Sequence, residues 1–273
     1  MVKNILARVY VWLMLFLMYA PILLLCVYSF TNSKTLGSWN GFSFELYRKL
    51  FADDEIMVAL FNTLTVALTA SICATILGTL GAIGIYYSKP RFKKVMEIGN
   101  QIPVMNAEII MAVSLTILFT LIFGFYTKVT GNDAGFGFIT LVIGHVVITV
   151  PFVVLSVIPK LKQMDPNIYE AALDLGSTPT KALYKVVFPE ILPGVFSGFL
   201  LSVTLSLDDY IITVFTKPDT YTTLSTLVYE KTKKVVPPAL RALTTLIFFG
   251  MLLIVLVINI RNNKKAPVKG RRR

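Results

Sequence analysis

Three carboxylates lie inside long apolar runs, and they are the side chains of this chain best suited to chemistry. Glu108 stands near the start of one run, and Asp208 and Asp209 stand in the later part of another. An ionisable group in an apolar helix is costly to bury and is therefore a candidate for function. Acids in such places offset the loss of hydration of a cation, so they favour a cationic ligand over an anionic one.

Asp209 shares one face of its expected helix with small and polar residues. On a helical wheel these residues fall within about 120° of one another. They are Gly194, Gly198, Ser202, Ser206, Asp209 and Thr213. Such a stripe suits either an aqueous path or a close contact between helices. Asp208 is turned about 100° away, so we expect it to pair with a neighbouring helix. The alternative is that both acids only hold helices together by hydrogen bonds.

Few other side chains offer chemistry. Tyr210 would add a cation–π contact beside Asp209 if its ring faces the path. For His145, a hydrogen bond to a neighbouring helix is expected in preference to a proton relay. Cys26 and Cys73 lie in apolar runs, and one histidine with two such cysteines makes neither a usual metal site nor a nucleophile triad.

Long apolar helices must position these residues. The chain has 273 residues, of which 55% are hydrophobic and 15% charged, and its mean hydropathy is +0.72. A helix crosses a membrane with about 20 apolar residues. The sequence predicts an all-α, polytopic membrane protein, a single domain over 1–273 with six spans. They cover residues 9–30, 59–87, 102–124, 136–158, 190–215 and 240–260.

The distribution of basic residues predicts the orientation. A cluster from Lys89 to Lys94 follows the second span, and much of the +11 net charge lies in the tail, 261–273. Basic connections stay in the cytoplasm, so both termini and the connection 159–190 are placed there. The lysines of 216–239 oppose this layout and are assigned to the outside nonetheless. A basic tail beside a span also indicates orientation rather than a nucleic-acid site.

The connection 159–190 contains two short amphipathic helices. Asp165 is the expected N-cap of the first and Gly176 its left-handed end. Its apolar stripe comprises Ile168, Ala171, Ala172 and Leu175. The second begins at Thr178 and ends where prolines lead into the fifth span. Helices this short are marginal alone. The pair therefore packs under its own bundle or at the lipid surface, or it docks in the groove of a cytoplasmic partner.

This connection resembles the EAA loop of ABC-type importer permeases. The resemblance rests on Glu-Ala-Ala, a later glycine and two prolines, namely Glu170, Ala171, Ala172, Gly176, Pro189 and Pro193. It implies the type I importer permease fold. It also implies that the loop docks on an ATP-binding subunit, with coupling carried by Glu170, Ala171, Ala172, Leu175, Gly176 and Pro189.

A second resemblance concerns the acids. The stretch from Ser206 to Ile212 is similar to the fifth span of the second permease subunit of spermidine/putrescine importers. A further match runs from Glu108 to Ser114, although that family usually has Pro-Asp where this chain has Ala107-Glu108. The resemblance implies a polyamine as solute. It also implies a path that includes Asp209, Asp208, Tyr210 and Glu108.

The resemblance implies an assembly. No phosphate loop occurs in the sequence, so this chain is expected not to be an enzyme and to hold no cofactor, with ATP and Mg²⁺ bound by a partner. The implied partners are a second permease, two ATP-binding subunits, an extracytoplasmic solute-binding protein and membrane lipid, without nucleic acid. The implied location is the plasma membrane of a prokaryote.

Three alternatives stay open at this point. The same architecture could import another solute, such as iron or a phosphonate. A secondary transporter would show inverted repeats with broken helices, and the halves of this sequence show no repeat. A purely structural membrane scaffold would leave no transport defect on deletion.

Overall fold

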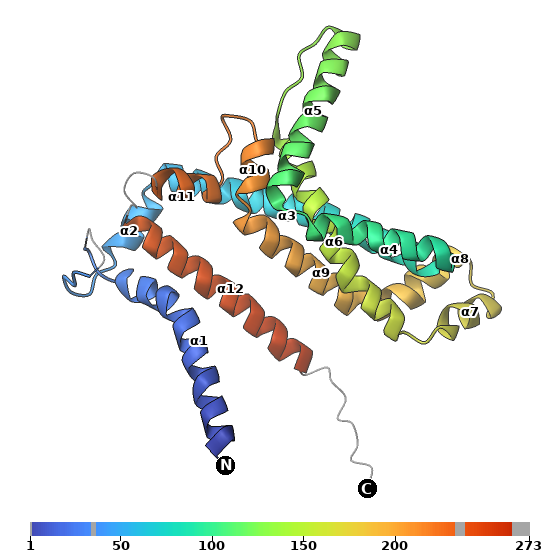
Figure 1. Cartoon of the computed structure of the whole chain (residues 1–273), viewed down its shortest axis with the longest axis horizontal. Coiled ribbons are helices and arrows are strands. Elements are labelled where there is room, and N and C mark those ends of the chain that lie inside the picture. Colours follow the sequence, from blue (N-terminus) through green and yellow to red (C-terminus); the bar gives the residue numbers. More distant parts are fainter. Residues whose placement is uncertain (1, 34–36, 233–237, 264–273) are drawn as a thin grey trace. The chain divides into compact units, whose positions relative to one another are not determined.

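The computed structural model describes residues 2–33, 37–232 and 238–263, and all regular elements in these ranges are helices (Figure 1). The all-α fold expected from the sequence is confirmed. In chain order the elements are α1 (Val2–Tyr28), α2 (Glu45–Phe51), α3 (Asp54–Tyr87), α4 (Pro90–Met105), α5 (Glu108–Thr130), α6 (Phe138–Gln163), α7 (Asn167–Asp174), α8 (Pro179–Ala182), the π-helical segment η1 (Leu183–Val187), α9 (Phe188–Asp208), α10 (Ile211–Thr216), α11 (Leu224–Thr232) and α12 (Ala239–Asn263).

Five helices in the described part of the chain are long and apolar enough to cross a membrane. They are Leu6–Tyr28, Asp54–Tyr87, Glu108–Thr130, Phe138–Gln163 and Pro179–Asp208. The sixth predicted span falls on α12, of which Ala239–Gly250 is an apolar helical segment among the described residues. The basic tail beyond residue 263 lies outside the described residues.

The chain divides into two compact units, residues 1–57 with 228–273 and residues 58–227. In the first unit, α12 packs against α1 and α2. Leu46 and Leu50 fall on one face of α2, and both are buried. Arg241 of α12 donates from Nη1 to the carbonyl of Ser33 at 3.1 Å, which holds the chain just after α1.

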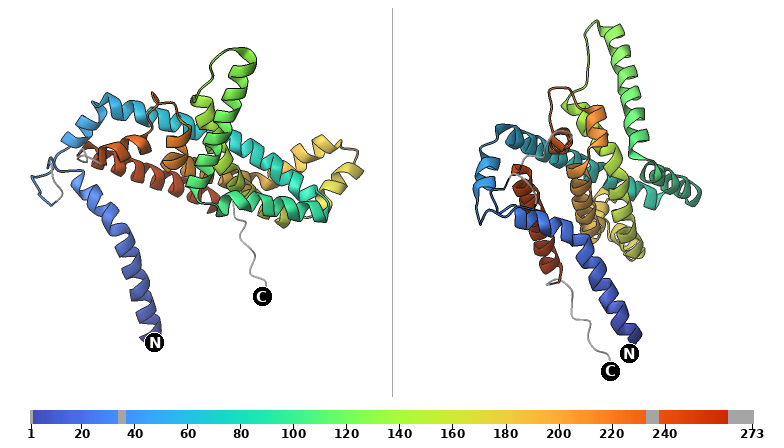
Figure 2. Two further views of the ribbon diagram at one scale, coloured as in Figure 1. Left: turned by 45° about the horizontal axis from the view of Figure 1, so that its top comes forward. Right: turned by 60° about the vertical axis from the view of Figure 1, so that its left-hand side comes forward.

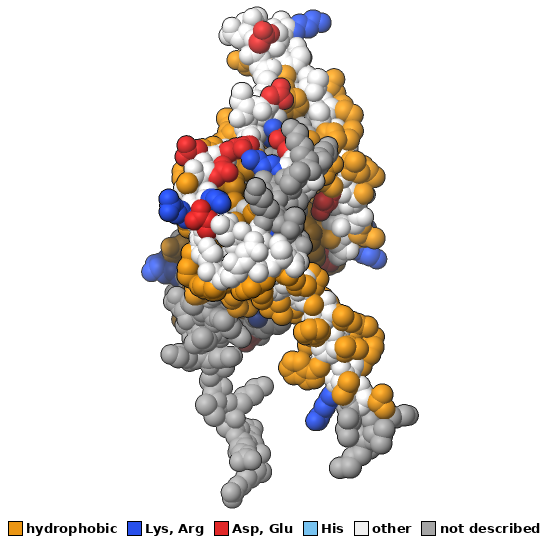
Figure 3. Space-filling view, turned by 90° about the vertical axis from the view of Figure 1, so that its left-hand side faces the viewer, with side chains coloured by type: hydrophobic (Ala, Val, Ile, Leu, Met, Phe, Trp, Pro, Cys, Tyr) orange, Lys and Arg blue, Asp and Glu red, His pale blue; other side chains and the backbone are white. Residues whose placement is uncertain are grey.

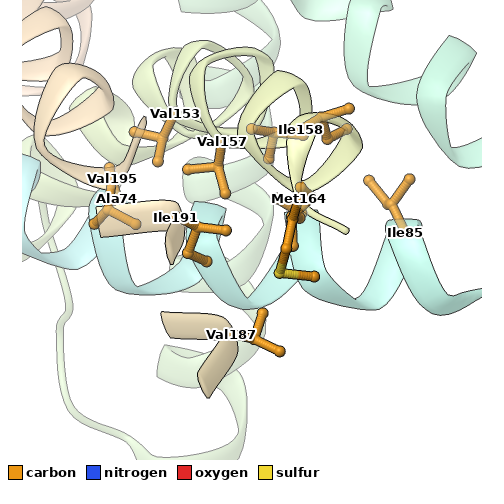
Figure 4. Close-up of a cluster of buried hydrophobic side chains, with 12 residues drawn as sticks. Ala74, Ile85, Val153, Val157, Ile158, Met164, Val187, Ile191 and Val195 are labelled. Carbon is orange, nitrogen blue, oxygen red and sulfur yellow. The ribbon is translucent and has the colours of Figure 1, made fainter. Parts of the chain in front are cut away.

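The second unit is built around α6 and α9, which lie side by side in Figures 1 and 2. Their shared core is a cluster of branched aliphatic side chains and small residues of α3 (Figure 4). Its buried members include Ala74, Ile85, Val153, Val157, Ile158, Met164, Val187, Ile191 and Val195. Small residues at such a seam allow helix backbones to approach closely.

The small-residue stripe of α9 faces this seam. Gly194, Gly198, Ser202 and Ser206 are all buried. A Cβ added to Gly198 would lie 3.1 Å from the Cα of Val153 in α6, closer than side chains normally approach. Of the two interpretations of the stripe, the structure supports the close helix contact within this chain.

The third span differs from its prediction. Residues 102–105 belong to α4, and the next long helix begins only at Glu108. Between them Asn106 has ψ 148° and Ala107 has φ −64° and ψ 134°, which is extended backbone. The prediction of one helix over 102–124 was therefore wrong at its start. These are the dihedral angles that an X-Pro pair would adopt. The break thus forms here although no proline is present.

The fifth span also differs from its prediction. A continuous helix was expected over 190–215, but α9 ends at Asp208 and α10 begins at Ile211. Asp209 between them is extended, with φ −63° and ψ 125°. The helical wheel drawn through Asp209 and Thr213 was therefore wrong beyond residue 208.

The connection between the fourth and fifth spans is shorter than the predicted 159–190. Helix α6 continues to Gln163 through Pro159, and α8, η1 and α9 succeed one another without interruption. Pro189 and Pro193 do not end a helix, contrary to expectation. Pro189 directly follows η1 and Phe188, so it lies inside the continuous helix. Prolines inside helices are tolerated in membrane proteins, because neighbouring helices and side chains satisfy the backbone groups that they leave unpaired.

Candidate functional site

The break between α9 and α10 is organised by the side chain of Asp209. Its Oδ2 accepts hydrogen bonds from the backbone N of Thr213 at 2.8 Å and from the Thr213 hydroxyl at 2.9 Å. Its Oδ1 lies 3.4 Å from the backbone N of Ile212. The first amides of a helix have no partner within that helix. The carboxylate supplies that partner, and it explains why a new helix starts here.

His145 of α6 completes a buried polar network around this break. Its Nδ1 lies 2.7 Å from Ser206 Oγ, and its Nε2 lies 3.0 Å from Thr213 Oγ1 and 3.7 Å from Asp209 Oδ2. The side chains of His145 and Asp209 are only 2% and 3% exposed. The expectation that His145 bonds to neighbouring helices is confirmed. The network joins α6, α9 and α10 at one point.

Hydroxyl groups from other elements hold the rest of α10. Ser225 donates to the carbonyl of Asp209 at 2.7 Å. At the other end, Thr140 donates to the carbonyl of Thr216 at 2.9 Å, and Thr116 donates to that of Phe215 at 3.0 Å. A helix of six residues cannot satisfy its own carbonyls. Side chains of α5, α6 and α11 therefore do so.

The two adjacent aspartates lie in opposite environments. Asp209 is buried, whereas Asp208 is exposed and forms no ion pair with any residue that the structure describes. The sequence predicted the reverse, with Asp209 beside the path and Asp208 paired with a neighbouring helix. That prediction assumed an unbroken helix. Tyr210 is half-buried at the start of α10.

An exposed stripe on α9 carries Asp208. Its members recur at intervals of three and four residues, which places them on one helix face. They are Ser197, Leu201, Thr204 and Asp208. This face lies away from the buried glycine seam. It presents two hydroxyl groups and a carboxylate at the surface of the chain.

Glu108 stands apart from the network. It is the first residue of α5, it is exposed, and within the described ranges it makes no ion pair. The apolar face of α5, with Ala112, Leu115 and Phe119, packs on Ile212 of α10. The structure brings Asp209, His145 and Thr213 together, and it shows no contact between Glu108 and either aspartate.

The predicted cytoplasmic loop has the expected ends. Asp165 Oδ1 accepts from the backbone N of Asn167 at 3.0 Å, and Gly176 has φ +82°, a left-handed conformation that favours glycine. The left-handed end at Gly176 is confirmed, whereas at the other end Asp165 bonds from one position before the N-cap residue, which is Pro166. The N–H of Gly176 bonds to the carbonyl of Leu173 at 2.9 Å and so closes α7.

The helical wheel predicted one continuous apolar face on α7, but the structure does not show one. Ala172 is buried and Ile168 half-buried, whereas Ala171 and Glu170 are exposed and Leu175 is 88% exposed. Leu175 lies at the end of α7, beyond the last regular turn, so the helical phase no longer applies to it. Pro189 is exposed within the continuous helix.

Sequence reasoning missed several members of the site. Thr116, Thr140 and Ser225 bond to α10 and its flanking residue, and Tyr184 of η1 is 74% exposed near the loop. A hydroxyl residue in an apolar run is a weak signal, because most such groups bond to their own helix, as Thr149 does to the carbonyl of His145. The break that creates unpaired carbonyls would have been the informative signal.

The apolar helices and the buried polar break define a multi-pass, all-helical membrane protein. Residues 74–262 match the family described as binding-protein-dependent transport system inner membrane component. This match covers more than half of the chain, so the chain belongs to this family. The fold, in which acids stand on apolar helices, is consistent with a membrane component of a transport system.

Curated relatives match over most of the chain. The putrescine transport system permease protein PotI of Escherichia coli (strain K12) is 36% identical over 231 residues, 84% of this chain and 81% of the relative. The spermidine/putrescine transport system permease protein PotC of Haemophilus influenzae is 34% identical over 249 residues, 90% of this chain and 93% of the relative. PotC of Escherichia coli (strain K12) is 33% identical over 239 residues, 88% and 87% respectively.

A solved structure supports the fold. A chain of a bacterial alginate ABC transporter, in complex with an alginate pentasaccharide-bound periplasmic protein, is similar with a TM-score of 0.74. The match covers 98% of this chain and 95% of that chain at 16% sequence identity. The likeness shows that the fold is that of ABC importer permeases, as predicted.

Proposed function

We propose that this chain is a permease subunit of an ATP-driven importer that carries polyamines into the cell. The observation that carries the proposal is the identity of 33–36% with permeases of putrescine and spermidine/putrescine transport systems, over 84–90% of the chain. The exposed carboxylates of α5 and α9 fit such a solute. None of these relatives favours iron, a phosphonate or a secondary transporter.

Asp208 is the acid that meets the solute in this proposal. A polyamine carries several ammonium groups, whose hydration must be replaced along the path. The exposed face of α9 offers Asp208 with Thr204 and Ser197, and Glu108 offers a second exposed acid on α5. Asp209 is buried and bonded to Thr213, so it shapes the path without touching the solute.

Coupling to ATP hydrolysis runs through the loop between α6 and α9. Leu175 and Tyr184 are 88% and 74% exposed, and Ala171 of α7 is exposed too. Large apolar side chains exposed on a soluble loop are typical of a surface that a partner covers. The left-handed Gly176 turns the chain between α7 and α8, which holds both helices in place.

The same proposal includes the remaining subunits. A second related permease, two ATP-binding subunits with ATP and Mg²⁺, and an extracytoplasmic solute-binding protein complete the importer. The loop faces the cytoplasm, and so do both termini. The family description supports the need for a binding protein, and the exposed loop supports an ATP-binding partner.

Polyamine uptake tests the role of Asp208. Asp208→Asn should lower uptake of radiolabelled putrescine or spermidine about tenfold, or about 1.4 kcal/mol in the limiting barrier. Uptake is measured in cells without other polyamine importers and normalised to inserted protein. Asp133→Asn, at an exposed acid of the loop between α5 and α6 and outside the coupling loop, is the matched control and should import normally. Unchanged uptake by Asp208→Asn would remove this acid from the path, and a wild-type complex that imports no polyamine would refute the solute.

ATPase stimulation tests the coupling loop. Leu175→Asp should abolish solute-stimulated ATP hydrolysis while the protein still inserts, because a charge would enter the apolar contact. Leu175→Met keeps the contact apolar and serves as the control. Gly176→Val should act similarly by straining the left-handed turn by about 1–2 kcal/mol. Normal stimulation in both Leu175→Asp and Gly176→Val would exclude the loop as the coupling element.

A further inference from the structure

An aromatic cluster closes the C-terminal end of α1. It consists of Tyr28, Phe30, Trp39, Phe42, Phe44 and Tyr47, and we refer to it as the aromatic cap. Phe30 is its centre, with ring centroids 5.5 Å from Phe42, 5.8 Å from Phe44 and 5.4 Å from Tyr47. Trp39 lies edge-on to Tyr28, the last residue of α1, at 6.4 Å.

Hydrogen bonds tie the cap to the end of α1. The N–H of Ser43 donates to the carbonyl of Phe30 at 2.7 Å, and the hydroxyl groups of Ser29 and Tyr47 lie 2.8 Å apart. The N–H of Asn40 donates to Thr31 Oγ1 at 3.1 Å. The segment after α1 therefore folds back onto the last turn of that helix. The rings lie at the level at which α1 ends.

The rings remain exposed despite these contacts. Trp39 is 52% exposed, Phe42 67% and Phe44 60%, and Phe51 at the end of α2 is 62% exposed. Contiguous apolar surface of this kind is covered by a partner or by lipid. Stacking within the cap orders the rings but does not bury them.

The length of α1 places the cap at a membrane boundary. The apolar segment Leu6–Tyr28 has 23 residues, which corresponds to about 35 Å of helix. The hydrocarbon core is about 30 Å thick. Side chains of α1 are hydrophobic and exposed over nearly all of its length, as Figure 3 shows for the helix at its lower right. Tyr28 and the cap against it thus lie where hydrocarbon meets headgroups.

The chemistry of the cap suits that boundary. Tryptophan and tyrosine are enriched at membrane–water interfaces, since their rings are apolar and carry one polar atom. Arg48 and Lys49 of the adjoining α2 are exposed, and long basic side chains reach headgroup phosphates from such positions. Helix α2 also packs against α12, and Leu46 and Leu50 on its other face are buried.

We infer that the aromatic cap is a lipid anchor, seated in the headgroup zone of the leaflet at the C-terminal end of α1. The apolar surface of α1 continues directly into it, so the lipid that surrounds the helix also covers the rings. The anchor fixes the depth of α1 and the height of α2. It depends neither on the solute nor on which side of the membrane the loop faces.

The two tryptophans of the chain, Trp12 and Trp39, allow a direct test. The full chain with Trp12→Phe, together with any subunits that co-purify, is reconstituted into vesicles of phosphatidylcholine brominated at either end of the acyl chains. The tryptophan fluorescence spectrum of Trp12→Phe, minus that of the double variant Trp12→Phe/Trp39→Phe, belongs to Trp39 alone. We expect bromine near the headgroups to quench Trp39 most, bromine near the terminal methyl groups to quench it least, and aqueous iodide to quench it weakly.

Further variants keep the test decisive. In Trp39→Phe, the remaining Trp12 lies within the span and should be quenched more by the deeper bromine than Trp39 is. In Trp12→Phe with Phe42→Ser and Phe44→Ser, Trp39 should lose bromine quenching and gain iodide quenching. Strong iodide quenching of Trp39 without bromine quenching would show water at the cap. Protection from both quenchers would show a protein partner there, and either result overturns the inference.

Discussion

Two interruptions of long apolar helices have almost the same backbone and are held in different ways. Ala107 before α5 has φ −64° and ψ 134°, and Asp209 before α10 has φ −63° and ψ 125°. Asp209 bonds to Thr213 and lies beside His145, whereas the helix after Ala107 has no side-chain cap. The same dihedral angles thus arise once from a side-chain network and once without one.

The difference lies in the length of the helix after each break. Helix α5 has 23 residues and can satisfy most of its own backbone groups, whereas α10 has only six. A short buried helix needs external donors and acceptors at both ends, and the structure supplies them from Asp209, Thr116 and Thr140. We therefore expect substitutions to be costly at the second break and nearly neutral at the first.

The largest effect is expected for Asp209→Ala. It removes the acceptor for the amides and hydroxyl of the first turn of α10, and a buried unsatisfied donor costs about 1–3 kcal/mol. We expect a stability loss of about 3 kcal/mol and less inserted protein. Asp209→Asn keeps an acceptor oxygen and should lose less. Thermal unfolding in detergent measures this, and equal stability of Asp209→Ala and wild type would show that the network does not hold the break.

A smaller loss is expected for His145→Leu. The change removes the partner of Ser206, but the Thr213 hydroxyl keeps its bonds to Asp209. The expected loss is about 1–2 kcal/mol, with His145→Gln intermediate because its amide can still bond. The same unfolding assay applies. A loss for His145→Leu as large as that for Asp209→Ala would mean that the histidine, and not the carboxylate, organises the break.

A small gain is expected for Ala107→Pro. The φ of Ala107 and the extended Asn106 before it are compatible with proline, which restricts the unfolded chain. Stability should rise by about 0.4–1 kcal/mol. Ser114→Pro, inside α5, is the control and should lose about 3 kcal/mol. Similar losses for the two prolines would show that Ala107 lies within a continuous helix in the membrane.

The smallest effect on stability is expected for Glu108→Gln. Glu108 is exposed at the first turn of α5 and makes no ion pair among the described residues. The unfolding free energy should change by less than about 0.5 kcal/mol. Polyamine uptake should nevertheless fall, by less than for Asp208→Asn. Glu108→Gln protein that is unstable would place this acid in a structural contact instead.

The sequence predicted the helical fold, the loop ends at Asp165 and Gly176, and the hydrogen-bonded state of His145. These features depend on local signals, namely apolar length, cap residues and one isolated polar side chain. The break at Asp209 was missed because the stretch from Ser206 to Thr213 contains no proline or glycine that would end a helix. Only the surrounding hydroxyl groups and His145 make the interruption favourable, and they come from distant parts of the chain.

The exposure of the neighbouring acids could not be predicted for the same reason. A helical wheel assigns Asp208 and Asp209 to faces about 100° apart, but it assumes one axis. Once Asp209 is extended, its side chain caps the next helix while Asp208 stays on α9. Likewise, Leu175 left the stripe of Ala172 because α7 had already ended.

The uninterrupted helix from Pro179 to Asp208 has the loop between α6 and α9 at one end and the exposed Asp208 at the other. Its 30 residues correspond to about 45 Å. A tilt of about 5° around the loop end would carry the Asp208 end sideways by about 4 Å. A twist at the loop would be reduced on the way by the π-helical turn at Leu183–Val187 and by the prolines at 189 and 193. In the proposed importer, a small displacement of the loop would thereby reach the residues around Asp208.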